Sequence, residues 1–136
     1  MKQLITIFLM AVTWSGTMAQ QLEVGLYQDQ LVRAAVAYCS SGNYHLMIDG
    51  QVVLRMEEGD ILYLTLEEEK IRVLDANNDF GYAGQVELRS LSTESVFRLR
   101  PLKPELESRI YDDNLLAVPG DRYITLVNQV DMDKYL

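Results

Sequence analysis

The histidine and cysteine side chains that could bind a transition metal are few in this sequence. His45 is the only histidine and Cys39 the only cysteine. Zinc sites are built mainly from several histidines and cysteines, so these two residues do not make up a ligand set. A lone cysteine in the run Ala-Tyr-Cys-Ser is expected to be a buried small side chain. We therefore predict no metal site and no cofactor, and expect His45 to be an exposed strand residue.

A serine nucleophile is the second chemistry to consider. Ser40 and Ser41 precede a glycine, and together with His45 they supply part of a serine-type triad. A nucleophile elbow also needs the Gly-x-Ser-x-Gly pattern at a strand–turn–helix junction. The sequence here does not have it, so we predict no serine nucleophile.

The stretch Asp75-Ala-Asn-Asn-Asp79 matches the first three ligand positions of a calcium loop. Such a loop continues with glycine at its sixth position and glutamate at its twelfth, where this chain has Phe80 and Val86. Aspartate and asparagine are also common in turns, because their side chains bond the local backbone. A hairpin turn is the expected structure.

Two acidic runs, Glu57-Glu58 and Glu67-Glu68-Glu69, could in principle hold a glycosidase pair of carboxylates. Neighbouring residues of a strand point to opposite faces, however, and both runs look like turns. We interpret them as solvated turn charge and predict no catalytic residue.

Tyrosines recur through the predicted strands. An exposed subset would form a platform on which the apolar faces of sugar rings could stack. The sequence leaves open which of them are exposed. The set is Tyr27, Tyr38, Tyr44, Tyr63, Tyr82, Tyr111 and Tyr123.

The first 19 residues are typical of a secretory signal peptide. Lys2 is followed by the apolar run Leu4–Trp14 and by Thr17-Met18-Ala19, a small-x-small cleavage site. The apolar run is short for a membrane span. We predict export through the Sec pathway to the periplasm, cell envelope or exterior, and a single mature domain of residues 20–136.

Charge narrows the range of partners. The full chain has 12 basic and 20 acidic residues, a net charge of −8. Loss of Lys2 with the signal peptide makes the net charge −9. This charge repels phosphate backbones and anionic lipids, so we expect neither nucleic-acid binding nor membrane binding after cleavage.

Short apolar runs with turns between them predict a mainly β fold. Asp49-Gly50 lies between two such runs and is a strong hairpin signal. About eight to ten short strands indicate one small β-sandwich or barrel-like domain. The expected strands are 22–26, 32–39, 44–48, 52–56, 61–66, 70–74, 86–88, 96–99 and 123–128, with a weaker signal over 80–84.

The pattern is less regular toward the C-terminus. Pro101 and Pro104 are expected to break regular structure. Glu105–Ile110 could form a single helical turn. After the last strand, Asp131 is a plausible N-cap for the start of a helix.

The last residues carry a resemblance to a known family. The stretch Leu126-Val127-Asn128, followed by Tyr135-Leu136, resembles the stage II sporulation protein D / LytB amidase-enhancer (SpoIID/LytB) family. In that family a strand ending in Val-Asn precedes a hydrophobic-Pro-Leu-Glu-acidic-Tyr-Leu run that opens a helix. This chain departs from the pattern with Asp131 in place of proline, Met132 in place of leucine and Lys134 in place of an acid.

Looser similarities extend the resemblance over most of the mature chain. They are Leu22–Tyr27 to the family's first strand, Gly42–Leu46 with Asp49-Gly50 to its hairpin, Glu58–Leu62 to the segment that follows, and Arg109–Tyr111 to its Arg-x-Tyr.

The resemblance implies a role in cell-wall remodelling. Studied members are peptidoglycan lytic transglycosylases or enhance an amidase, so the implied partners are glycan strands or a cell-wall amidase. The family's catalytic glutamate lies beyond Tyr-Leu, in a Gly-Val-Val-x-x-Glu helix that this chain does not contain. We therefore expect a fragment that ends before the active site and is itself inactive. The alternative is a self-contained envelope binding or adaptor module without enzymatic activity.

Overall fold

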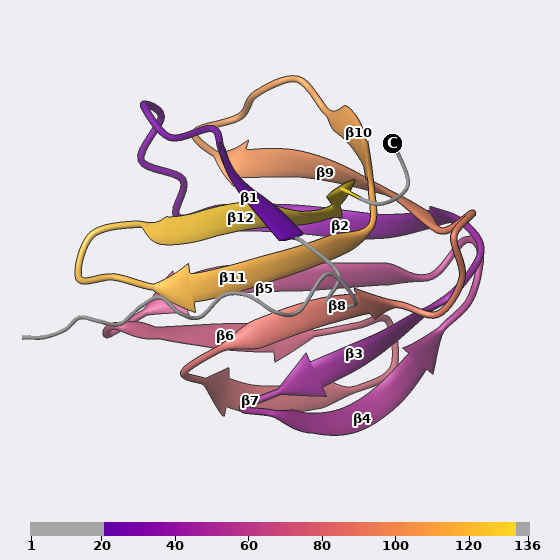
Figure 1. The fold of residues 1–136 in the computed structure, drawn as a ribbon. Coiled ribbons are helices and arrows are strands. Elements are labelled where there is room, and N and C mark those ends of the chain that lie inside the picture. The colour runs from indigo at the N-terminus through magenta and orange to yellow at the C-terminus, as the bar shows by residue number, and fades with distance from the viewer. Residues whose placement is uncertain (1–20, 133–136) are drawn as a thin grey trace, which may run out of the picture.

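Strands with a two-residue apolar period account for most of the chain. The computed structural model describes residues 21–132, which form twelve strands in two antiparallel sheets of six (Figure 1). Sheet A has the order β1 (Gln21–Leu26), β12 (Ile124–Asp131), β11 (Asn114–Pro119), β8 (Val86–Ser90), β3 (Tyr44–Ile48) and β4 (Gln51–Met56). Sheet B has the order β10 (Arg109–Asp112), β9 (Val96–Lys103), β2 (Ala34–Ser41), β5 (Ile61–Glu67), β6 (Lys70–Leu74) and β7 (Asp79–Ala83).

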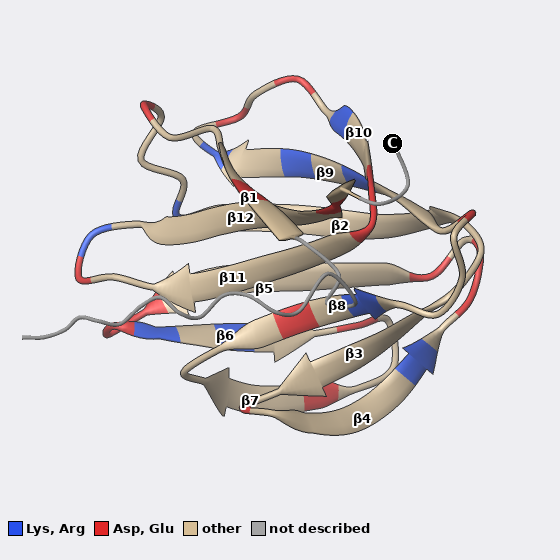
Figure 2. Ribbon diagram, viewed as in Figure 1, with Lys and Arg blue, Asp and Glu red and all other residues tan. Residues whose placement is uncertain are grey.

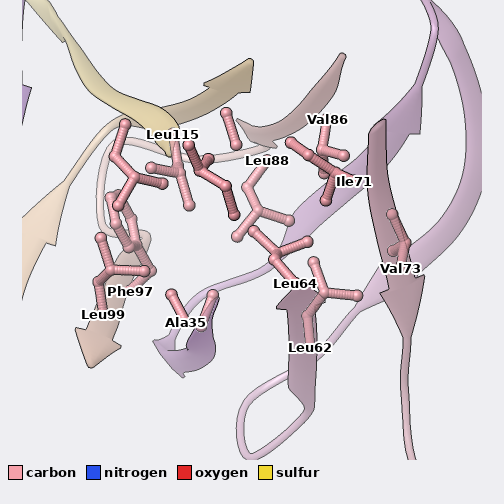
Figure 3. Packing of buried hydrophobic residues seen from close by; sticks show 14 of the residues in the cluster. Ala35, Leu62, Leu64, Ile71, Val73, Val86, Leu88, Phe97, Leu99 and Leu115 are labelled. Carbon is pink, nitrogen blue, oxygen red and sulfur yellow. The ribbon is translucent and has the colours of Figure 1, made fainter. Parts of the chain in front are cut away.

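The two sheets bury one apolar core between them. Leucine, valine and phenylalanine side chains from both sheets point toward one another there (Figure 3). In β5, for example, Leu62 and Leu64 are fully buried, whereas Tyr63 between them faces outward. The predicted all-β class is confirmed.

The strand count exceeds the eight to ten that we predicted. Glu105–Ile110 does not form the predicted helical turn, because Arg109 and Ile110 belong to β10 and pair with Leu99 and Arg98 of β9. A few residues without clear alternation are enough for a short edge strand when a long neighbour supplies the hydrogen bonds.

Pro101 does not break regular structure as predicted, because it lies inside β9. The register places Pro101 opposite Ala35 but Lys103 opposite Ala34, so Leu102 is the extra residue of a bulge. Proline is tolerated at bulges, where the ladder of amide hydrogen bonds is already interrupted.

The predicted N-cap is also wrong. Asp131 is the last residue of β12, and its amide donates to the Asp113 carboxylate across 3.1 Å. The described residues contain no α-helix. Most of the predicted helical turn, including Tyr135 and Leu136, lies outside the described residues.

The signal peptide prediction, residues 1–19, lies outside the described residues as well. Within residues 21–132, no helix is long and apolar enough to cross a membrane.

Candidate functional site

Three outward-facing tyrosines lie on the outer surface of sheet B. Tyr38 of β2 is half-buried, whereas Tyr63 of β5 and Tyr82 of β7 are 40% and 55% exposed. Their strand neighbours Ala37, Leu62 and Ala83 are core residues, so the alternation of the strands turns the tyrosines outward. We call the surface formed by Tyr38, Tyr63, Tyr82 and Arg72 the tyrosine face.

The register sets the tyrosines on a diagonal. Tyr38 pairs with Ile61, so Tyr63 lies one strand over and two residues further along. Tyr82 pairs with Arg72, and Arg72 with Thr65, which puts Tyr82 two strands and two residues beyond Tyr63. With strands ~4.8 Å apart and a rise of ~3.4 Å per residue, the stripe is about 20 Å long. It is long enough for several sugar rings of an extended chain.

A polar network holds the Tyr82 end of the stripe. The Tyr82 hydroxyl donates to the Glu67 carboxylate at 2.9 Å, and the Arg72 guanidinium lies 5.7 Å from the Tyr82 ring centroid. Arg72 also donates to Asp79 and lies 4.0 Å from Glu67. Arg72 thus holds both the aromatic ring and two carboxylates in place.

The same contacts shift the ionisation of these groups. The hydrogen bond to Glu67 raises the pKa of Tyr82, and the bond from Arg72 lowers the pKa of Asp79. The bond to Asp79 in turn raises the pKa of Arg72. Near neutral pH the network therefore contains the neutral Tyr82 phenol beside the charged Arg72 and Asp79, an arrangement that suits hydrogen bonding to hydroxyl groups.

Basic residues continue the surface past Tyr38. Arg98 and Arg100 of β9 lie opposite Tyr38 and Val36 of β2. Figure 2 shows basic residues along β9 and β6, while many of the acids lie in the turns. Arg98 donates to the Ser108 hydroxyl at 3.0 Å. Arg100 pairs with the Glu105 carboxylate at 3.6 Å, so Arg98 contributes most of the positive charge at this end of the stripe.

The other tyrosines have structural positions. Tyr44 is fully buried, and Tyr27 is buried with its hydroxyl bonded to the Glu107 carbonyl at 2.9 Å. Tyr111 packs against Phe97, with ring centroids 5.5 Å apart. Tyr123 is 39% exposed, but it lies next to β12 on sheet A. Only part of the predicted tyrosine set therefore forms a common surface.

Three of the residues that carry the SpoIID/LytB resemblance, Leu126, Val127 and Asn128, lie in β12 and do not form a surface site, whereas Tyr135 and Leu136 lie outside the described residues. Leu126 is buried in the core, and Val127 is half-buried on the other face of the strand. Asn128 is buried, and its amide donates to the carbonyls of Asp112 and Asn114 at 2.8 and 2.9 Å. Asn128 thus ties β12 to the turn between β10 and β11, which is a structural role.

The structure does not bring the isolated polar residues together. His45 is half-buried in β3 of sheet A, between Arg55 and Arg89 on the neighbouring strands. Ser41 lies in β2 of sheet B, where its hydroxyl donates to the Glu94 carbonyl at 3.0 Å. Cys39 is buried as predicted, and desolvation raises the pKa of its thiol to about 11.

The predicted turns at Asp75 and at Glu57-Glu58 agree with the geometry, whereas Glu67, predicted as turn charge, is the last residue of β5, and only Glu68 and Glu69 form the turn that follows. The Asp75 carboxylate accepts from the amides of Asn77 and Asn78 at 2.8 and 2.7 Å. Burial alone would raise the pKa of Asp75, but these hydrogen bonds outweigh it and lower the pKa. Within residues 21–132, no group of three or more acidic, histidine or cysteine side chains could hold a metal ion. Glu57 pairs with Arg55 at 2.7 Å in the turn after β4.

Comparison with known proteins adds no assignment: no family model, no curated protein and no solved structure matches this chain.

The alternation within each strand could have revealed the exposed tyrosines. Tyr63 is out of phase with Leu62 and Leu64, whereas Tyr44 is in phase with Leu46. The sequence does not reveal that β2, β5 and β7 lie in one sheet, so the common surface could not be predicted.

Proposed function

We propose that this chain is a glycan-recognition domain of a secreted cell-wall remodelling protein similar to the SpoIID/LytB family. In this proposal the tyrosine face binds peptidoglycan glycan strands and the chain itself does not cleave them. The cellular location follows from the predicted signal peptide, so the domain would act in the periplasm or cell envelope. A cell-wall amidase is the partner implied if the protein is an amidase enhancer.

The observation that carries the proposal is the diagonal of Tyr38, Tyr63 and Tyr82. Sugar rings offer apolar faces for stacking and hydroxyl groups for hydrogen bonds, so they suit rows of aromatic rings with polar neighbours. Glu67 and Asp79 supply acceptors beside the Tyr82 ring. Arg98 and Arg100 would favour the carboxylates of stem peptides at the opposite end of the stripe.

The absence of cleavage is proposed on chemical grounds. A transglycosylase needs a positioned general acid whose pKa is raised. On the sheet B side of the molecule, the pKa of Asp75 and of Asp79 is lowered instead.

Co-sedimentation with purified glycan strands tests the proposal. The mature chain should pellet with strands that carry or lack stem peptides, and Tyr63→Ala/Tyr82→Ala should reduce retention at least tenfold. The control is Val52→Ala, a 53% exposed apolar residue on the β4 edge of sheet A, which should not change retention.

Mass spectrometry of the same samples tests the second half of the proposal. We expect no anhydro-muropeptides. Their release by this chain would contradict a purely binding role. Absence of both release and retention would instead favour the envelope adaptor module.

A further inference from the structure

A pocket of about 330 Å³ opens between β1 and β12, in the sheet opposite the tyrosine face. Glu23 and Gly25 of β1 line it, as do Thr125 and Val127 of β12. These residues alternate with the core residues Leu26 and Leu126, so the pocket opens on the outer side of sheet A. It is therefore a separate candidate site.

Gln28 forms one wall of the pocket by folding back over β1. The chain turns after β1, where the Gln30 amide donates to the Tyr27 carbonyl at 3.1 Å. The side-chain amide nitrogen of Gln28, Nε2, then lies only 1.9 Å from the point that a Cβ atom of residue 25 would occupy. Gly25 lies in a regular strand, without the positive φ that favours glycine. The missing side chain is needed here to make room for Gln28.

The lining combines an aromatic ring and hydrogen-bonding groups with the buried apolar residues Leu26, Ile124 and Leu126. Tyr123 contributes a ring, Thr125 a hydroxyl, Gln28 an amide and Glu23 a carboxylate. The Glu23 carboxylate also accepts from Gln129 at 3.2 Å, which steadies it at the mouth. No lysine, arginine or histidine lines the pocket. The charge therefore disfavours anions, and the mixed lining disfavours a wholly apolar ligand.

A sugar ring fits this chemistry. Its apolar face can stack on Tyr123, and its hydroxyl groups can donate to Glu23 and exchange hydrogen bonds with Gln28 and Thr125. The volume lies at the lower end of the range for ligand pockets, which suits a single ring better than a strand.

We propose that this pocket is a second carbohydrate site, which binds one neutral pyranose unit. Gly25 acts as a positioning residue, because it lets the Gln28 amide reach the ligand. This inference does not require the tyrosine face to bind glycan strands.

Titration of the mature chain with glucose and with N-acetylglucosamine, followed by amide NMR, tests the inference. At least one of the two sugars should shift the amide signals of Gly25 and Thr125, with millimolar affinity. Tyr123→Ala should weaken that binding about tenfold, as expected for the loss of an aromatic contact. Gly25→Ala should weaken it by a similar factor by displacing Gln28, with little change in melting temperature.

Val52→Ala is the control, since it removes a 53% exposed side chain from β4, at the opposite edge of the same sheet and outside both proposed surfaces, and should leave monosaccharide affinity unchanged. The inference is wrong if neither sugar shifts these amides. Equal affinity of the wild type, Tyr123→Ala and Gly25→Ala would also overturn it. Neither result bears on binding of glycan strands by the tyrosine face, which the co-sedimentation measures separately.

Discussion

Tyr44 is a core residue with an unusual polar atom. Its ring is fully buried and meets Phe97 edge-on, with centroids 6.0 Å apart. Its hydroxyl has no hydrogen-bond partner among the described residues, and burial raises the pKa of this phenol far above its usual range. A buried donor without a partner loses its hydrogen bonds to water on folding and gains none within the protein, which costs about 1–3 kcal/mol.

We therefore expect Tyr44→Phe to leave the free energy of unfolding unchanged or to raise it by about 1 kcal/mol. Tyr27→Phe is the matched control, because the Tyr27 hydroxyl donates to the Glu107 carbonyl at 2.9 Å. That variant should lose about 1 kcal/mol. Urea unfolding measures both, and an equal loss in the two variants would show that the Tyr44 hydroxyl is bonded.

Asn128, one of the residues that carry the SpoIID/LytB resemblance, has a clear structural role. Its buried amide serves the carbonyls of Asp112 and Asn114. Asn128→Ala should lower the free energy of unfolding by about 1–3 kcal/mol, because both carbonyls lose a donor. Gln129→Ala, next to it on β12, removes only a bond to exposed Glu23 and should change stability by less than about 0.5 kcal/mol. Similar losses in chemical denaturation would argue against a special role for Asn128.

At the scale of elements, the sequence predicted those strands whose alternation is clear and whose turns use favourable residues. Asp49 and Gly50 have φ angles of 50° and 85°, as the predicted Asp-Gly hairpin requires. The edge strand β10 was missed because its four residues show no alternation against the core. The bulge beside Pro101 was missed because it depends on the register with β2, which local sequence does not encode.

The β5–β6 turn is an element that uses unfavourable residues. Glu68 and Glu69 have φ angles of 51° and 67°, so a two-residue hairpin loop forms without asparagine or glycine. For residues other than glycine, this left-handed backbone conformation costs roughly 1 kcal/mol or more.

Glu68→Asn/Glu69→Gly should therefore raise the free energy of unfolding by about 1 kcal/mol. The reciprocal change Asp49→Glu/Gly50→Glu in the β3–β4 turn should lower it. Thermal and urea unfolding of the two variants compare the turns directly. A stability loss in the first variant would mean that the glutamates make contacts that outweigh the backbone cost.

At the scale of the whole molecule, the two proposed binding surfaces lie on opposite outer sides of one shared core. Sheet B presents the tyrosine face and sheet A the smaller pocket. Neither could be predicted from sequence, because each is assembled from strands that are distant in the chain. The types of residue were visible in advance, but their proximity comes from the pairing order β2-β5-β6-β7 and from the β1–β12 pair.

The net charge expected after removal of the predicted signal peptide gives a prediction at this scale. A net charge of −9 offers no attraction to anionic wall polymers, so binding should depend on stacking and hydrogen bonds. Retention on peptide-free glycan should therefore change less than about twofold when the ionic strength is raised from about 0.01 M to about 0.15 M. This change shortens the Debye length from ~30 Å to ~8 Å. Co-sedimentation at the two salt concentrations measures this. A loss that grows steeply with salt would indicate electrostatic binding through Arg98 and Arg100.

The most direct test of glycan recognition is amide NMR of the isotope-labelled mature chain during titration with soluble, peptide-free glycan oligomers. The account predicts shift changes concentrated in Tyr38, Ile61–Glu67, Lys70–Leu74 and Asp79–Ala83, and their loss in Tyr63→Ala/Tyr82→Ala. No shift changes in sheet B, or the same changes in that double variant, would contradict glycan recognition by the tyrosine face.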